Sequence, residues 1–243
     1  MHMDRRQFVK NLGLGTASLS MGSLVTASSC APSGDSSLKQ NVKEGEDGQF
    51  LFIGDDIAIA QTEYGKVQGY LLNHVYTFLG VPYGADTSGK NRFMPPQKPE
   101  PWTDVRPAVF YGNTAPQRME NRWPNNYGTF ADHWNYWDVS EDCLYLNVWT
   151  PGIADGKKRP VLVWLHGGGF TNGSGIEQDG YHGENISREG DIVFCSINHR
   201  LGPIGFSDLS GVGGEAYKDS GNVGMLDIIA ALRWVHDNIA NFG

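Results

Sequence analysis

The fold of this chain is decided by the stretch VLVWLHGGGF, residues 161–170, in which a short apolar run leads into three consecutive glycines. An apolar run this short, rich in valine and leucine and without polar alternation, predicts a strand buried on both faces, as in a parallel sheet. The glycines allow positive φ angles and a close approach of the backbone to another molecule. Exposed N–H groups at such a turn can donate to an anion, or to a carbonyl oxygen that becomes one.

Length and composition limit the class of protein. A chain of 243 residues fits one α/β domain or a piece of a larger protein, and its 40% of hydrophobic side chains can build a core. The net charge of −8 disfavours nucleic acid as a partner, because binding a phosphate backbone needs a basic face. Neither Cys-x-x-Cys nor His-Glu-x-x-His occurs, so the sequence predicts no metal site.

Residues 1–30 have the layout of a twin-arginine export signal. Arg5 and Arg6 precede a weakly apolar stretch rich in glycine and serine, residues 11–29. The alternative is a basic helix end followed by a core helix, which the glycines disfavour. An uninterrupted apolar span of about 20 residues is absent, so no mature transmembrane helix is predicted. We therefore expect export to the periplasm or cell envelope.

The end of this signal offers two ways of processing. Cys30 is followed by a polar stretch, residues 31–50, and the arrangement is similar to a lipoprotein cleavage site, in which the cysteine is acylated and the polar stretch is a tether. Ala27 stands where such sites usually carry leucine. Ordinary cleavage near Ala27 is the alternative to a lipid anchor at Cys30.

The remaining residues, 51–243, predict an antiparallel meander that leads into a parallel sheet with flanking helices. Meander strands are expected at 57–60, 66–72 and 75–79, and residues 80–137 are rich in proline and predict mostly loop. Residues 144–149 alternate and predict a strand with one covered face, and 192–197 predict a second buried strand. A final helix should lie flat on the sheet through apolar side chains at spacings of 3 and 4, namely Met225, Ile228, Leu232, Val235, Ile239 and Phe242. Aromatic residues within 123–137 are candidates for a pocket wall or for a loop pinned to the surface by its rings.

Three chemistries fit a glycine turn after a strand. A phosphate-binding Walker loop needs a lysine, which Gly173-Ser174-Gly175 lacks. A dinucleotide-binding turn needs an acidic residue at the end of the next strand, where the sequence reads Asn198-His199-Arg200. The third chemistry is an oxyanion hole for acyl transfer, of the His-Gly-Gly-Gly type found in α/β-hydrolases.

Several ordered motifs resemble the type-B carboxylesterases, the cholinesterase-like branch of the α/β-hydrolases. The resemblance runs from about Gly65 to Gly243, with a break around 120–137. The matching stretches are FLGVPYG (78–84), Arg92-Phe93 with Pro95-Pro96, EDCLYLNVW (141–149), HGGGF (166–170), NHRLG (198–202), GNVGMLD (221–227) and WVHDNIANFG (234–243).

The resemblance implies an enzyme that cleaves small carboxylic esters through a serine acyl-enzyme, without cofactor or metal. It makes Gly168 and Gly169 the oxyanion donors. It places the nucleophilic serine in a Gly-x-Ser-x-Gly elbow soon after Gly243, with the acid and the histidine later, and no such elbow occurs in this sequence. We therefore expect an incomplete, amino-terminal part of an α/β-hydrolase fold that is inactive by itself. The motifs define neither the ester nor an oligomeric state.

Two other classes of protein remain open. A non-catalytic, cholinesterase-like binding or adhesion protein would keep the fold and replace the serine. A truncated gene product would end at a true stop codon. The next stretch of the reading frame distinguishes these alternatives from an enzyme.

The resemblance also implies structural roles for charged residues. Arg92 should pair with Glu141 and Arg200 with Asp227, each buried pair tying a loop to the sheet, and His166 should orient the turn by a hydrogen bond. Removing one partner of a buried pair typically costs about 3–5 kcal/mol. The sheet is further expected to expose an unpaired parallel edge, and the final helix to be only half covered.

Departures from the family pattern concern cysteine and histidine. Family members often pair the cysteine at Cys143 with one upstream, but none lies between Cys30 and Cys143, so a free thiol is expected. Cys195 lies in an apolar run and should be a buried small side chain. His199 replaces a usual tyrosine and is expected to be buried and structural.

Overall fold

The computed structural model describes residues 51–118 and 138–243. The predicted export signal with Cys30, the linker 31–50, and the aromatic loop 123–137 therefore lie outside the described residues. No helix of the described part is long and apolar enough to span a bilayer.

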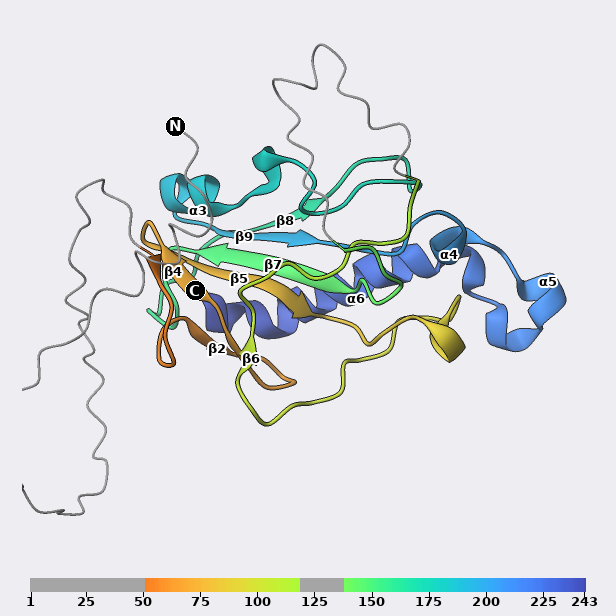
Figure 1. Ribbon diagram of the computed structural model, residues 1–243, viewed down its shortest axis with the longest axis horizontal. Helices are drawn as coiled ribbons and strands as arrows, with labels where there is room; N and C mark the ends of the chain where they lie inside the picture. Colours follow the sequence, from red (N-terminus) through yellow and green to blue (C-terminus); the bar gives the residue numbers. More distant parts are fainter. Residues whose placement is uncertain (1–50, 119–137) are drawn as a thin grey trace, which may run out of the picture. The chain divides into compact units, whose positions relative to one another are not determined.

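The main sheet has six strands in the order β1-β4-β5-β7-β9-β8 (Figure 1). Its strands are β1 (Leu51–Phe52), β4 (Tyr70–Leu72), β5 (Val75–Pro82), β7 (Tyr145–Thr150), β8 (Val161–Leu165) and β9 (Val193–Ile197). Of the predicted meander, the antiparallel pair β4–β5 lies in this sheet, where β1 and β7 extend it on either side, also antiparallel. Strand β9 is antiparallel to β7 and parallel to β8, so the sheet is mixed and the predicted parallel part consists here of one pair.

A second, small sheet contains β2 (Ile59–Gln61), β3 (Lys66–Gln68) and β6 (Arg106–Pro107). The prediction of one strand over 66–72 was wrong, because the chain passes from the small sheet to the main sheet at Gly69. A side chain at Gly69 would overlap the carbonyl oxygen of Thr77 in β5. Glycine is therefore needed where the two sheets approach each other.

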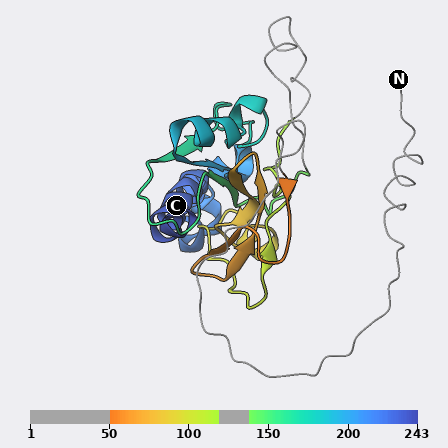
Figure 2. The same cartoon turned by 90° about the vertical axis from the view of Figure 1, so that its left-hand side faces the viewer.

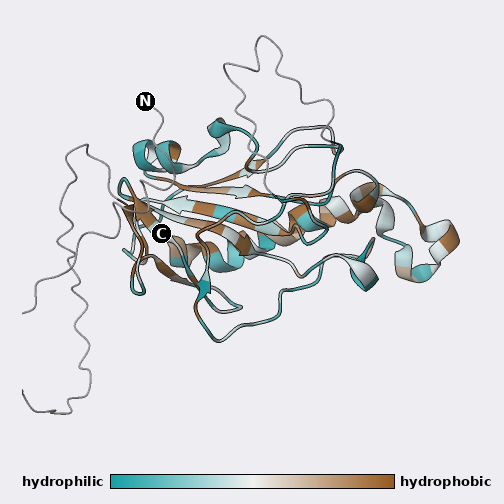
Figure 3. Ribbon diagram, in the orientation of Figure 1, coloured by the Kyte–Doolittle hydropathy of each residue, from teal (hydrophilic) through white to brown (hydrophobic). Residues whose placement is uncertain are grey.

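Helices cover both faces of the main sheet. The described α-helices are α3 (Glu184–Gly190), α4 (Gly202–Phe206), α5 (Ser210–Gly213) and α6 (Val223–Asn238). Figures 1 and 2 show α3 and α6 on opposite faces. Leu146 and Val148 of β7 belong to the same core as α6, whereas Trp149 packs with Phe194 on the face where Ser187 of α3 donates to the Trp149 carbonyl at 3.0 Å. In Figure 3 hydrophobic residues gather on these central strands.

Two predictions of strand burial were wrong in opposite directions. Strand β7 was expected to have one covered face, but all its residues after Tyr145 are buried, because it lies between β5 and β9 with helices on both sides. Strand β8 was expected to be buried on both faces, yet Leu162 and Leu165 are 37% and 45% exposed. Strand β8 is the last strand of the sheet, and β9 is its only strand partner in the described part of the chain.

The final helix also differs from its prediction. The α-helix ends at Asn238 and continues as a 3-10 turn, Ile239–Phe242. Ile228, Val235 and Phe242 are buried as predicted, but Leu232 is 43% exposed. The buried stripe instead includes polar and small positions that apolar spacing misses, namely Gly224, Asp227, Ala231 and Asn238.

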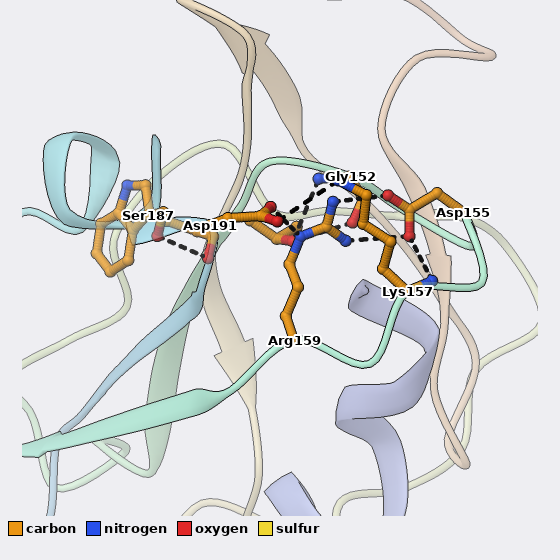
Figure 4. A network of polar contacts seen from close by, with 8 residues as sticks. Gly152, Asp155, Lys157, Arg159, Ser187 and Asp191 are labelled. Carbon is orange, nitrogen blue, oxygen red and sulfur yellow. Dashed lines mark hydrogen bonds and ion pairs between the residues drawn. The ribbon is translucent and has the colours of Figure 1, made fainter. Parts of the chain in front are cut away.

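An arginine cluster that sequence reasoning missed holds the connection between β7 and β8 (Figure 4). The Arg159 side chain is 3% exposed. Its two terminal nitrogens donate to the carboxylate of Asp155 at 3.0 and 2.6 Å, and its Nε donates to Asp191 at 2.8 Å. Asp191 follows α3 with a φ of 46°. The cluster therefore ties residues 151–160 to the end of α3.

Candidate active site

Strand β8 delivers the glycine turn at its carboxyl end, where the backbone becomes left-handed. The φ angles are 117° at Gly168, 60° at Gly169 and 62° at Phe170. A side chain at residue 168 would overlap the carbonyl oxygen of Asn172, whereas a Cβ at Gly169 meets nothing within 4 Å. The turn thus requires glycine at 168 for its own folding, and at 169 it leaves open space beside the backbone.

Hydrogen bonds inside the turn set the direction of its peptide groups. The Gly168 carbonyl accepts from the backbone N–H of Thr171 at 3.1 Å and of Asn172 at 3.3 Å. The Gly167 carbonyl accepts from His166 Nδ1 at 2.8 Å. Because N–H and C=O of one trans peptide point in opposite directions, the N–H groups of Gly169 and Gly168 point away from these contacts. Among the described residues, no acceptor takes either N–H.

The neck of the turn is closed around the His166 ring. A side chain at Gly173, where φ is 111°, would overlap both the Gly167 carbonyl oxygen and His166 Nδ1. On its other side the ring of His166 stacks on that of His199, with ring centroids 4.8 Å apart and planes 11° from parallel. The start and the end of the turn, residues 166 and 173, are therefore packed against each other. The predicted hydrogen bond of His166 reaches the Gly167 carbonyl.

His199 is buried, as expected, with 4% of its surface exposed. Its Nδ1 donates to the Arg200 carbonyl at 2.9 Å. Burial lowers the pKa of His199, because a charged imidazolium is poorly solvated there. A neutral ring stacks on His166 without charge repulsion.

Two amide side chains to which the sequence assigned no role hold the end of the turn. Gln117 accepts from the Gly173 N–H at 2.7 Å and donates to the Gly173 carbonyl at 2.9 Å. Asn198 accepts from the Gly175 N–H at 2.8 Å and donates to the Asn113 carbonyl at 3.0 Å. Asn198 belongs to the stretch NHRLG, residues 198–202, but no local pattern signals that Gln117 reaches a residue so far along the chain.

The ion pair between Arg200 and Asp227 is present and deeply buried. The two side chains are 1% and 0% exposed, and the guanidinium contacts the carboxylate at 2.6 and 2.8 Å. The Arg200 N–H also donates to Asp227 at 3.1 Å, and its Nη1 reaches the Met94 carbonyl at 2.8 Å. The pair fixes the segment after β9 to helix α6.

The ion pair between Arg92 and Glu141 is also present, at 2.8 Å, but its expected burial was wrong. The Arg92 side chain is 48% exposed and that of Glu141 20%. The pair lies in loops near the surface, where water solvates the guanidinium. A pair this exposed typically contributes about 0–1 kcal/mol.

Both described cysteines have free thiols. Cys143 and Cys195 are buried and form no disulfide. Burial raises the pKa of Cys195 to about 12 and that of Cys143 well above its usual value. Neither thiol is therefore a nucleophile near neutral pH.

A cavity of about 470 Å³ lies beside the turn. Phe170 contributes one wall and Phe206 the other, with ring centroids 5.1 Å apart. The Gly202 N–H donates to the Phe170 carbonyl at 2.7 Å and keeps the two walls together. The site thus combines two outward N–H groups with an adjacent apolar surface, an arrangement suited to a carbonyl oxygen that gains negative charge. No described cluster of His, Cys, Asp or Glu could hold a metal ion.

Comparisons with known proteins identify a family for this chain. The model of a family described as the carboxylesterase family matches residues 56–243. Phenmedipham hydrolase of Pseudarthrobacter oxydans is 44% identical over 185 residues, which are 76% of this chain and 35% of that protein. The para-nitrobenzyl esterase of Bacillus subtilis is 42% identical over 188 residues, again 76% of this chain and 35% of that protein.

A solved structure has a similar fold over the matched part. An esterase from Clostridium hathewayi, described as able to hydrolyse aliphatic aromatic polyesters, superposes with a TM-score of 0.72 at 41% identity. The match covers 80% of this chain and 37% of that one. The chain therefore spans about 35% of the length of the curated relatives it matches.

Proposed function

The chain belongs to the carboxylesterase family, and on that basis we propose that the complete protein is a serine hydrolase of small carboxylic esters. A serine outside residues 1–243 attacks the ester carbonyl, the alcohol leaves, and water then releases the acid from the acyl-enzyme. A histidine base takes the serine proton and gives it to the leaving alcohol. Residues 1–243 supply the turn that receives the carbonyl oxygen.

The observation that carries this proposal is the direction of the two N–H groups at Gly168 and Gly169. Both point out of the turn, and no described acceptor competes for them. In the tetrahedral intermediate the ester oxygen becomes an oxyanion, and donors already fixed in direction need no reorganisation at that moment. Removing one such donor costs about 3–4 kcal/mol of transition-state stabilisation.

The test compares two alanine substitutions in the complete gene product. Gly169→Ala should keep the fold at a cost of about 1–2 kcal/mol, because its Cβ meets open space but its φ of 60° disfavours a side chain. It also places a methyl group where the substrate carbonyl must approach, and we expect 4-nitrophenyl acetate hydrolysis to fall by on the order of 100-fold or more. Gly168→Ala should lose more stability, because its Cβ overlaps Asn172.

A fluorophosphonate probe provides the independent readout. Wild-type complete protein should be labelled at one serine, and residues 1–243 expressed alone should give neither label nor turnover. Absence of label and turnover in the wild-type complete protein would refute the proposal and favour a binding protein. Full activity in Gly169→Ala would refute the role of the turn.

We further propose that the chain is exported by the twin-arginine route. Support comes from Arg5 and Arg6 before the weakly apolar stretch 11–29. Replacing both arginines with lysine should leave the protein in the cytoplasm on cell fractionation. Palmitate labelling that is lost in Cys30→Ala would identify a lipid anchor, and a mature terminus near residue 27 would identify ordinary cleavage.

A further inference from the structure

Gly173, at the end of the oxyanion turn, is held by the side chain of Gln117, which lies 56 residues before it in the sequence. The amide of Gln117 engages both polar groups of Gly173, accepting from its N–H at 2.7 Å and donating to its carbonyl at 2.9 Å. Two opposed bonds of this kind fix the position and also the rotation of a peptide unit. Gly173 has no side chain through which the turn could be held otherwise.

The position of Gly173 is transmitted directly to the oxyanion donors. The backbone of Gly173 is packed so closely on the Gly167 carbonyl and on His166 Nδ1 that no Cβ would fit there. The Gly167 carbonyl belongs to the same peptide as the Gly168 N–H. A shift of Gly173 therefore changes the direction of a group that must bind the oxyanion.

Gln117 is itself fixed from several directions. Its Nε2 also donates to the Ala115 carbonyl at 3.1 Å. The preceding Thr114 donates its N–H to the Asp138 carbonyl at 2.8 Å and accepts from the Ser140 N–H at 3.0 Å. The Asn113 carbonyl accepts from Asn198 at 3.0 Å. The glutamine is thus carried by a segment bound to both neighbouring loops, as positioning of a catalytic group requires.

We propose that Gln117 is a positioning residue for the oxyanion turn, acting through Gly173 on the N–H groups of Gly168 and Gly169. This inference rests on the proposed ester hydrolysis. Gln117 does not touch the reacting atoms, and its removal leaves both donors in the chain but releases the neck of the turn. The consequence is a loss of transition-state binding rather than of substrate binding.

The kinetic test uses Gln117→Ala and the equally long Gln117→Met in the complete protein. We expect kcat to fall by on the order of 10–100-fold in both, with KM changed by less than about threefold, because a misplaced donor matters most in the transition state. Affinity for a trifluoromethyl ketone, whose serine adduct carries an oxyanion, should fall by the same factor as kcat/KM. Affinity for the product alcohol should stay unchanged.

The matched control is Gln97→Ala. Gln97 is exposed, and its side chain also donates to a backbone carbonyl, that of Pro95 at 3.0 Å. This hydrogen bond does not involve the oxyanion turn. This variant should keep wild-type kcat. Unchanged kcat in Gln117→Ala and Gln117→Met, or equal losses of alcohol and ketone affinity, would overturn the proposal.

Amide hydrogen exchange tests the clamp without any activity. In Gln117→Ala the Gly173 N–H should exchange at least tenfold faster, whereas the Gly175 N–H, held by Asn198, should keep its rate. Unchanged exchange at Gly173 would overturn the clamp. An inactive wild-type protein would overturn the proposed function, and exchange at Gly173 would still decide whether Gln117 fixes the turn.

Discussion

The burial of strands β7 and β8 is the reverse of what their compositions predict. Strand β8, VLVWL, is wholly apolar, yet Val161, Leu162 and Leu165 are 37–45% exposed. Strand β7, YLNVWT, contains Asn147 and Thr150, yet every residue after Tyr145 is buried. Burial in this sheet therefore follows from the position of a strand and from what covers it, and composition reports only what a strand tolerates.

Strand β7 tolerates its polar residues because they are satisfied. Asn147 donates to Ser196 Oγ at 3.1 Å and accepts from the Gly80 N–H at 3.0 Å. Buried amides of this kind cost little once both ends have partners. The Gly80 contact lies at the register shift between β5 and β7, so the bulge and the buried asparagine depend on each other.

Strand β8 has the composition of a covered parallel strand. The relatives of this chain are almost three times as long as the region that they share with it. We expect the complete protein to cover β8, in which Val161, Leu162 and Leu165 are exposed in the described residues. In residues 1–243 the two strands should therefore respond differently to mutation.

The largest effect on stability is expected for two ion pairs that show the same contrast, one of them buried and the other exposed. Arg200→Ala removes one partner of a pair whose side chains are 1% and 0% exposed, and leaves the Asp227 carboxylate buried. We expect a loss of about 3–5 kcal/mol in the free energy of unfolding. Arg92→Ala, at 48% exposure, should cost about 0–1 kcal/mol. Urea denaturation followed by circular dichroism measures both, and equal costs would contradict the contrast.

The strands themselves are compared by truncating one leucine in each. Leu146→Ala in β7 removes a fully buried side chain and should destabilise by about 2–5 kcal/mol. Leu162→Ala in β8 removes a side chain that is already 37% exposed. It should cost about 1 kcal/mol or less, because water can fill the space and no closed cavity is left. The same urea experiment applies. A larger cost at Leu162 would show that β8 is covered in solution.

Covering can be tested by charging the open strand. Leu162→Lys places a charge on an apolar edge strand. Natural edge strands often carry lysine, which opposes association with another strand. We expect residues 1–243 to scatter less light at high concentration, with a stability change of about 0.5 kcal/mol or less. Thr103→Lys, which adds the same single positive charge at an exposed loop position, is the control and should leave scattering nearly unchanged. Equal improvement in both variants would assign the effect to net charge.

Local patterns predicted the elements but not their neighbours. The meander, the strands β7, β8 and β9 and the glycine turn follow from periodicity and from glycine chemistry within a few residues. Strand order and exposure depend on which segments meet, so β7 and β8 were assigned the wrong burial. Gln117 and Arg159 escaped for the same reason, because a glutamine in a loop and an arginine before a strand have no distinctive local pattern. The motifs at Arg200 and Asp227 were recognised only through their family resemblance.

The smallest effect concerns acid and the connection between the two strands. Hydrogen bonds from Arg159 lower the pKa of Asp155 to about 2 and also lower that of Asp191. A carboxylate with a depressed folded pKa stabilises the fold above its unfolded pKa of about 3.9 and loses that contribution as the pH falls toward 2. Between pH 4 and 2 the loop 151–160 should therefore be released from α3.

Release at this loop should affect β8 before β7, because β8 is otherwise held by β9 alone among the described strands. Amide exchange, expressed as protection factors, should show Trp164, whose N–H faces β9 in the parallel register, losing protection between pH 4 and 2 while Val148 stays protected. Asp155→Asn should show weak protection at Trp164 already at pH 6, and Asp104→Asn, at an exposed position, should behave like wild type. Parallel loss at Trp164 and Val148 would mean that acid unfolds the sheet as one unit and that the Arg159 cluster does not hold β8 separately.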